Sequence, residues 1–125
     1  MTMLPVLVSR GWANQMYARY GYPVYLIGSA IHDENARDYD ILVILPDESF
    51  EARYGSVARW RVDRWNNDAG EVTKKWSADV GKLADHVSRC IHKNVDFKVY
   101  PESYAAEFAN GEKVRLDSIP DEIKA

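Results

Sequence analysis

The segment Tyr39–Leu45 is an almost unbroken apolar run rich in branched residues, and it constrains the fold more than any other part of this sequence. Such a run is typical of a strand that is covered on both faces. Pro46 follows directly and ends the strand, because proline cannot donate a hydrogen bond to a neighbouring strand. We therefore predict a central strand at Tyr39–Leu45 in a layered fold.

Three other segments are predicted to join this strand in one sheet. The apolar Val24–Ile27 runs into Gly28, and Val95–Tyr100 alternates apolar with polar side chains. A weaker candidate, Lys113–Leu116, fits an edge strand. We expect the first two to neighbour the central strand in a small mixed sheet with helices packed on it, an α+β (α/β layered) class, with residues 1–125 forming one domain.

Helices are predicted before, between and after these strands. Apolar residues recur at helical spacing over Leu4–Tyr20, and Glu102–Ala109 is typical of a short helix that ends at Asn110 and Gly111. The segment 47–65 follows neither helical nor strand spacing over a long window, and we favour short helical turns there.

The best supported helix precedes the last long strand. Asp68 and Glu71 resemble a capping box, Asn94 is expected to provide a left-handed stop, and Cys90 is expected to be a small core residue. The apolar stripe of this helix has a period near 3.6 and consists of Val72, Trp76, Val80, Leu83, Val87 and Ile91.

Charge and cysteine content exclude several classes of function. Sixteen Lys and Arg residues against nineteen Asp and Glu residues give a formal net charge of −3, which does not favour bulk nucleic-acid or membrane binding. One cysteine excludes an intramolecular disulfide framework and a cysteine-rich zinc site. Because neither a signal peptide nor a membrane span is visible, we expect a cytoplasmic protein.

Three aspartates stand at the starts of predicted strands. Asp38 and Asp40 lie two residues apart, so their side chains project to one face with roughly 6.5 to 7 Å between the residues. Two anions at this spacing repel each other unless a cation lies between them, and oxygen ligands suit Mg²⁺. With Asp96 on another strand, they are suited to hold two ions about 3.5 to 4 Å apart, as phosphoryl-transfer sites do.

These residues occur in an order that resembles a known signature. An apolar strand, Gly28-Ser29, a polar loop and Asp38-Tyr39-Asp40 opening the next apolar strand are similar to the polymerase β type nucleotidyltransferase superfamily. The strand that begins at Val95-Asp96 matches the family's third-carboxylate strand. The stretch is similar both to the head of tRNA nucleotidyltransferases and poly(A) polymerases and to minimal nucleotidyltransferases. His32 stands where tRNA nucleotidyltransferases carry an arginine.

The resemblance implies a role for each matched residue. Gly28 and Ser29 would bind the triphosphate of an NTP, Asp38 and Asp40 would hold metal ions, and Asp96 would complete the metal set and activate the attacking hydroxyl. The cofactor would be a pair of Mg²⁺ ions, with Mn²⁺ as an alternative. The reaction would transfer a nucleoside monophosphate to a hydroxyl on a protein, an RNA or a small molecule, with release of pyrophosphate.

Three alternatives stay open at this point. Lys98 shares a strand face with Asp96 and either neutralises phosphate or pairs with a carboxylate. The whole domain is either an enzyme, whose acceptor is selected by a groove, a homodimer or a partner chain, or a catalytically silent module that binds a partner protein. A cluster in the middle third forms either a phosphate or nucleic-acid groove with stacking platforms or a solvated surface whose tryptophans anchor the core. It comprises Arg53, Arg59, Arg61, Arg64, Lys74, Lys75, Trp60, Trp65 and Trp76.

Overall fold

The computed structural model describes residues 3–33, 35–67 and 70–117, with side chains from residue 10 onward. Its elements are α1 (Met3–Tyr20), β1 (Val24–Ile27), the 3₁₀ turn η1 (Gly28–Ile31), β2 (Asp38–Leu45), α2 (Asp47–Arg53), α3 (Val57–Trp65), α4 (Glu71–Ile91), β3 (Asn94–Pro101), α5 (Glu102–Phe108) and β4 (Val114–Arg115).

The four strands form one mixed sheet in the order β3-β2-β1-β4. β2 pairs in parallel with β3 and antiparallel with β1, and β1 pairs antiparallel with the two-residue β4. The predicted α+β class and the mixed sheet are therefore confirmed. The central strand lies where its apolar run predicts, between two neighbours.

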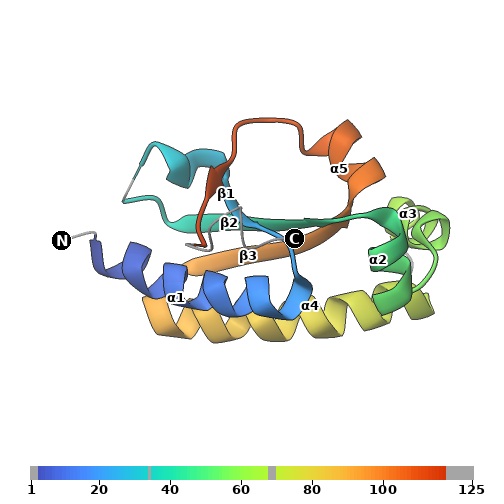
Figure 1. The fold of residues 1–125 in the computed structure, drawn as a ribbon, viewed down its shortest axis with the longest axis horizontal. Coiled ribbons are helices and arrows are strands. Elements are labelled where there is room, and N and C mark those ends of the chain that lie inside the picture. The colour runs from blue at the N-terminus through green and yellow to red at the C-terminus, as the bar shows by residue number, and fades with distance from the viewer. Residues whose placement is uncertain (1–2, 34, 68–69, 118–125) are drawn as a thin grey trace.

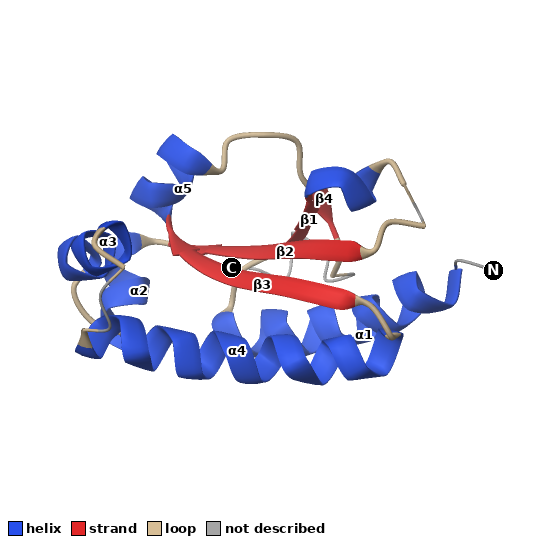
Figure 2. Cartoon of the chain, turned by 180° about the vertical axis from the view of Figure 1, so that it is seen from behind, coloured by secondary structure: helices blue, strands red, loops and turns tan. Residues whose placement is uncertain are grey.

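Two long helices cover one face of the sheet. α1 and α4 lie side by side beneath it, and α5 and η1 lie on the opposite side (Figure 1, Figure 2). The residues of β2 and β3 that face these helices are buried, among them Ile41, Val43, Phe97 and Val99. Because strand side chains alternate, the residues between them lie on the other face, which we call the polar face.

The long helix α4 follows its predicted apolar stripe, with Trp76, Val80, Val87 and Ile91 buried. Its ends differ from the prediction. Gly70 is the N-cap without a side-chain hydrogen bond, so Glu71 is the first helical residue and the capping box is wrong. Asp68 lies outside the described residues.

The left-handed residue at the end of α4 is His92, with φ of 56°, because the parallel pairing of β3 already begins at Asn94. Asn94 is therefore a strand residue and not the helix stop. Cys90 is exposed, which makes its predicted core position wrong. It lies one residue before Ile91 on α4, and this step of about 100° turns it away from the buried stripe.

The segment 47–65 forms two short helices, as favoured above. Trp60 of α3 is fully buried, and it contacts Phe50, Trp76 and Tyr104 edge to face. Trp65 instead has 88% of its surface exposed. Two of the three tryptophans in this cluster thus anchor the core, and the third does not.

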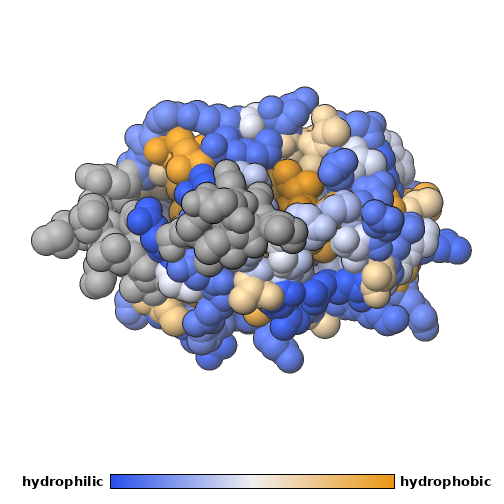
Figure 3. Space-filling view, viewed as in Figure 1, coloured by the Kyte–Doolittle hydropathy of each residue, from blue (hydrophilic) through white to orange (hydrophobic). Residues whose placement is uncertain are grey.

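The indole of Trp76 also closes part of the edge of the sheet. Its Nε1 donates a 2.6 Å hydrogen bond to the carbonyl oxygen of Val99 in β3. Elsewhere the visible surface is mainly hydrophilic, with hydrophobic side chains in a few separate patches (Figure 3). Among the described residues, no helix is long and apolar enough to cross a membrane.

A polar network joins α1, α2 and α4. The hydroxyls of Tyr20 and Tyr54 donate to Asp79 Oδ2 at 3.0 and 2.6 Å, and Arg19 pairs with Oδ1 of the same carboxylate. Burial raises the pKa of both tyrosines. Burial alone would raise the pKa of Asp79, but the two hydroxyls and the Arg19 charge outweigh it and lower that pKa.

We expect Asp79→Asn to lower the free energy of unfolding at pH 7 by about 1 to 2 kcal/mol, because hydrogen bonds to a charged acceptor are lost. A carboxyl with a lowered pKa stabilises the fold above its ordinary value of 3.8, and this contribution disappears as the pH falls through the lowered value. Denaturant unfolding from pH 7 to pH 2 measures the difference, which should shrink below about pH 4.

Asp85→Asn is the matched control, because Asp85 is exposed on the same helix. A difference between the Asp79 variant and the wild type that stays constant with pH would contradict the network.

Candidate active site on the polar face

The register of the sheet brings the predicted carboxylates together. In the parallel pairing of β2 with β3, Asp40 lies opposite Asp96 and Asp38 lies opposite Asn94. Paired strands are about 4.8 Å apart, so Asp40 and Asp96 are immediate neighbours on the polar face. The expectation that β1, β2 and β3 are neighbours in one mixed sheet is met, and Asp38, Asp40 and Asp96 lie at the same end of that sheet.

Gly28 contacts this group from the other side of β2. It follows Ile27, which pairs with Asp40, and its φ of +77° is a conformation that favours glycine. A Cβ atom on Gly28 would lie 2.6 Å from Asp40 Oδ2. Glycine is therefore required here for two reasons. Its backbone angle favours glycine, and the Asp40 carboxylate comes too close for a side chain.

Two of the three carboxylates have partners. Lys98 Nζ lies 2.6 Å from Asp96 Oδ1, and the side-chain amide of Asn94 donates to Asp38 Oδ1 at 3.2 Å. For the carboxylate of Asp40, no hydrogen bond or ion pair is found within the described ranges. Burial, followed by the charges of Asp96 and Asp38, raises the pKa of Asp40, and the charge of Lys98 only partly opposes this. Asp40 thus carries the least compensated negative charge of the site.

The three carboxylates are the type of ligand that a hard divalent cation prefers. All three side chains offer carboxylate oxygens, the ligands preferred by Mg²⁺, and a cation would relieve the repulsion that raises the pKa of Asp40. As the side chains stand, no group of three or more His, Cys, Asp or Glu residues in the described part of the chain is arranged to hold a metal ion. At this site, Asp96 is engaged by Lys98 and Asp38 by Asn94.

A cavity lies beside Gly28, and none of the three carboxylates lines it. Its volume is about 430 Å³, within the usual range for small-molecule sites. Ile27, Ile31, Tyr100 and Phe108 give it apolar walls, and the segment after α5 completes it. At the exposed rim of the cavity, His32 Nε2 contacts Glu112 Oε1 at 2.7 Å.

Gly28, Asp38, Asp96 and Lys98 lie around Asp40, and Asn94 is an addition to the predicted set. Ser29 is exposed in the turn that Gly28 begins and is not among the residues that line the cavity. Lys98 takes the second of its two predicted roles and pairs with a carboxylate. Asn94 was not predicted for the site, although the period-two alternation that joins Asp96 to Lys98 also places Asn94 on that face.

Comparisons of this chain with protein-family models, with curated proteins and with solved structures found no match.

We expect Gly28→Ala to destabilise the fold by about 1 to 3 kcal/mol, because alanine is strained at this φ and its Cβ collides with Asp40. Gly81→Ala is the matched control, since Gly81 lies in α4 with open space around its Cβ position, and it should stabilise the helix by about 0.5 to 1 kcal/mol. Thermal and denaturant unfolding measure both changes. Equal effects of the two substitutions would show that Gly28 and Asp40 are not in close contact.

Proposed function

We propose that this chain is a metal-dependent nucleotidyltransferase that transfers a nucleoside monophosphate from an NTP to a hydroxyl acceptor and releases pyrophosphate. The observation that carries the proposal is the in-register placement of Asp40 and Asp96 on neighbouring strands, with Asp38 on the same face and Gly28 against Asp40. The resemblance of Gly28-Ser29 and Asp38-Tyr39-Asp40 to the polymerase β type signature supports the same reaction class.

The nucleotide would bind across the end of β1. The backbone N–H groups that begin η1 at Gly28 and Ser29 are suited to phosphate oxygens, because the first N–H groups of a helical turn have no partner within it. The adjacent 430 Å³ cavity offers apolar walls for the nucleoside. Lys98 is only partly buried and can exchange Asp96 for a phosphate oxygen.

Asp38, Asp40 and Asp96 would hold Mg²⁺, or Mn²⁺ in its place. The bound ions would neutralise the charge of the triphosphate and of the transition state. Residues of this chain would position the acceptor hydroxyl in line with the α-phosphate.

Asp96 is the base in this proposal. The acceptor oxygen forms a bond to the α-phosphorus, the bond from that phosphorus to the bridging oxygen of pyrophosphate breaks, and the proton of the hydroxyl passes to the Asp96 carboxylate. Release of Lys98 from Asp96 would free the carboxylate for this proton and place the ammonium beside the phosphates.

The acceptor would be selected by a groove on this domain, by a second copy or by a partner chain. We place the protein in the cytoplasm, because an exposed and unpaired thiol at Cys90 fits a reducing compartment. The silent binding module is the competing proposal, and the 2.6 Å pair of Lys98 and Asp96 favours it, because the lysine already neutralises the third carboxylate.

We expect Asp40→Asn to reduce nucleotidyl transfer by at least about 10³-fold, since a positioned charge in phosphoryl transfer is worth this much or more. Asp96→Asn should also abolish transfer but largely keep nucleotide binding, because Asp38 and Asp40 still hold the metal while the base for the attacking hydroxyl is lost. The assay incubates the protein with each labelled NTP and Mg²⁺ and offers tRNA, other proteins and the protein itself as acceptors.

Asp85→Asn, on the exposed face of α4, should keep full activity. If the wild type transfers label and either site variant matches it, the assigned roles are wrong. If wild-type protein binds no nucleotide in the presence of Mg²⁺ by calorimetry, the silent module is the better description.

In the absence of divalent ions, Asp40→Asn should hold or raise the melting temperature, because the site loses a carboxylate that its neighbours repel. Mg²⁺ with NTP should raise the melting temperature of the wild type by mass action and that of the variant much less. Differential scanning calorimetry measures both. An equal rise in the two proteins would place the bound ion elsewhere.

A further inference from the structure

Basic side chains line a hollow where α4 ends and where β2 and β3 begin, at the left of Figure 1. The hollow has a volume of about 600 Å³ and lies at the same end of the sheet as the carboxylates. We call it the basic hollow. Among the described residues, no carboxylate lines it. Its lining consists of Arg37, Ser88, Arg89, His92, Lys93 and Asn94.

Three cations share this hollow without a counter-charge. Within the described ranges, no ion pair is found for Arg37, Arg89 or Lys93. Lys93 Nζ donates to the carbonyl oxygen of Ala36 at 3.0 Å, and Arg89 Nε donates to that of Asp85 at 3.4 Å. These bonds orient the two side chains but do not neutralise them. Because like charges repel, an anion between them would stabilise the hollow.

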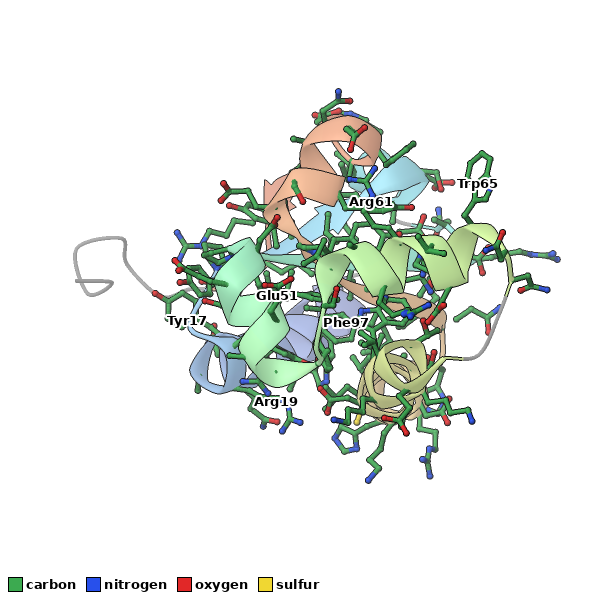
Figure 4. The ribbon with its side chains drawn as sticks, turned by 90° about the vertical axis from the view of Figure 1, so that its right-hand side faces the viewer. Tyr17, Arg19, Glu51, Arg61, Trp65 and Phe97 are labelled. Atoms are coloured by element: carbon green, nitrogen blue, oxygen red, sulfur yellow. The ribbon has the colours of Figure 1, made fainter. Side chains whose placement is uncertain are left out.

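Two other arginines of the molecule are compensated instead. Arg19 pairs with Asp79, and Arg61, which lies between α3 and α5 in Figure 4, pairs with Glu107 at 2.6 Å. The chain as a whole has a formal net charge of −3, so it does not attract anions in general. The positive charge of the basic hollow is therefore local, and a ligand must reach it directly.

Asn94 connects the basic hollow to the carboxylates. It lines the hollow, and its side-chain amide donates to Asp38 Oδ1 at 3.2 Å. Asp96 follows two residues later on the same face of β3, roughly 6.5 to 7 Å along the strand. The hollow thus borders the residue that the proposed function assigns as the base.

The hollow and the turn at Gly28 lie on opposite sides of the carboxylates on β2. In the strand order β3-β2-β1-β4, Gly28 follows β1 and Asn94 begins β3. In phosphoryl transfer, the attacking and leaving oxygens lie roughly in line on opposite sides of the phosphorus. A triphosphate at Gly28 would have its leaving group on the side of β1. The acceptor would then approach from the side of β3, where the hollow lies.

We propose that the basic hollow binds the phosphate group of the acceptor, and that the acceptor is a sugar phosphate. This inference rests on the proposed transferase. Arg37, Arg89 and Lys93 pair with the phosphate, and a hydroxyl of the attached sugar reaches Asp96. One sugar separates phosphate from hydroxyl in such a molecule, which suits the short path from Asn94 to Asp96. The unit comes either as a free sugar phosphate or as the last nucleotide of a single strand.

Nuclear magnetic resonance titration of the full chain in EDTA tests the hollow apart from the transferase reaction. Ribose 5-phosphate should shift the backbone amide signals of Arg89, Lys93 and Asn94, and ribose should not. A pentaribonucleotide with a free 3′-hydroxyl distinguishes the two sources. Tighter binding of the pentaribonucleotide than of ribose 5-phosphate identifies a strand end, and equal or lower affinity identifies the free sugar phosphate.

Two variants assign the phosphate contacts. Arg37→Gln and Arg89→Gln should each weaken the binding of ribose 5-phosphate by about three- to tenfold, because a charge-assisted hydrogen bond is lost. Both side chains are exposed, so their replacement leaves the core intact. The matched control is Arg59→Gln, which removes the same charge from an exposed position of α3 and should bind as the wild type does.

A kinetic readout separates this role from a structural one. In the transfer reaction, Arg89→Gln should raise the KM for the acceptor and leave kcat and the KM for the NTP unchanged. Asp40→Asn should bind ribose 5-phosphate in EDTA at least as tightly as the wild type. Failure of the proposed transferase and failure of the basic hollow are therefore separate results.

Several outcomes would overturn the proposal. They are absence of ribose 5-phosphate binding, equal binding of ribose, unchanged affinity in both arginine variants, and signals that shift at Gly28 rather than at Lys93. Tighter binding of a phosphoserine peptide than of both probes would also overturn it, because the acceptor would then be a protein.

Discussion

The pairing of β2 with a strand on each side is the constraint on which the rest of the molecule depends. Its parallel register with β3 sets Asp40 beside Asp96, and its antiparallel register with β1 sets Asp40 beside Ile27, so that the next residue is Gly28. A shift of one residue in either ladder would send the carboxylates into the apolar layer over α1 and α4. The core and the candidate site are therefore specified by the same hydrogen bonds.

The parts of the fold that follow from short-range rules were predictable from the sequence. Apolar runs bounded by glycine or proline located the strands, and the period of two located Asp38 and Asp40 on one face, while the register with β3 placed Asp96 beside them. What depends on three-dimensional neighbours was not predictable. Whether Lys98 pairs with a phosphate or with Asp96 depends on side-chain positions. In the structure, Lys98 Nζ lies 2.6 Å from Asp96 Oδ1.

The residues around α3 show the same limit more clearly. The sequence places Arg64 and Trp65 side by side on a short helix, and local spacing does not reveal that one joins four aromatic rings while the other stays in solvent. Nor does it show that Asp63 lies against Gly70, because this contact depends on how α3 packs against the start of α4. Burial of a charge is a property of the packed layers and not of any window of residues.

The hydrogen bond from Trp76 to the carbonyl of Val99 has a consequence for association. β3 is long and lies at the edge of the sheet, where free backbone groups would accept a strand from another molecule. The indole occupies one of those groups, the carbonyl of Val99, while the opposite edge strand has only two residues. A strand added along β3 would have to do without the Val99 carbonyl, and one added along β4 would find two residues to pair with, so each border is an incomplete template for strand addition.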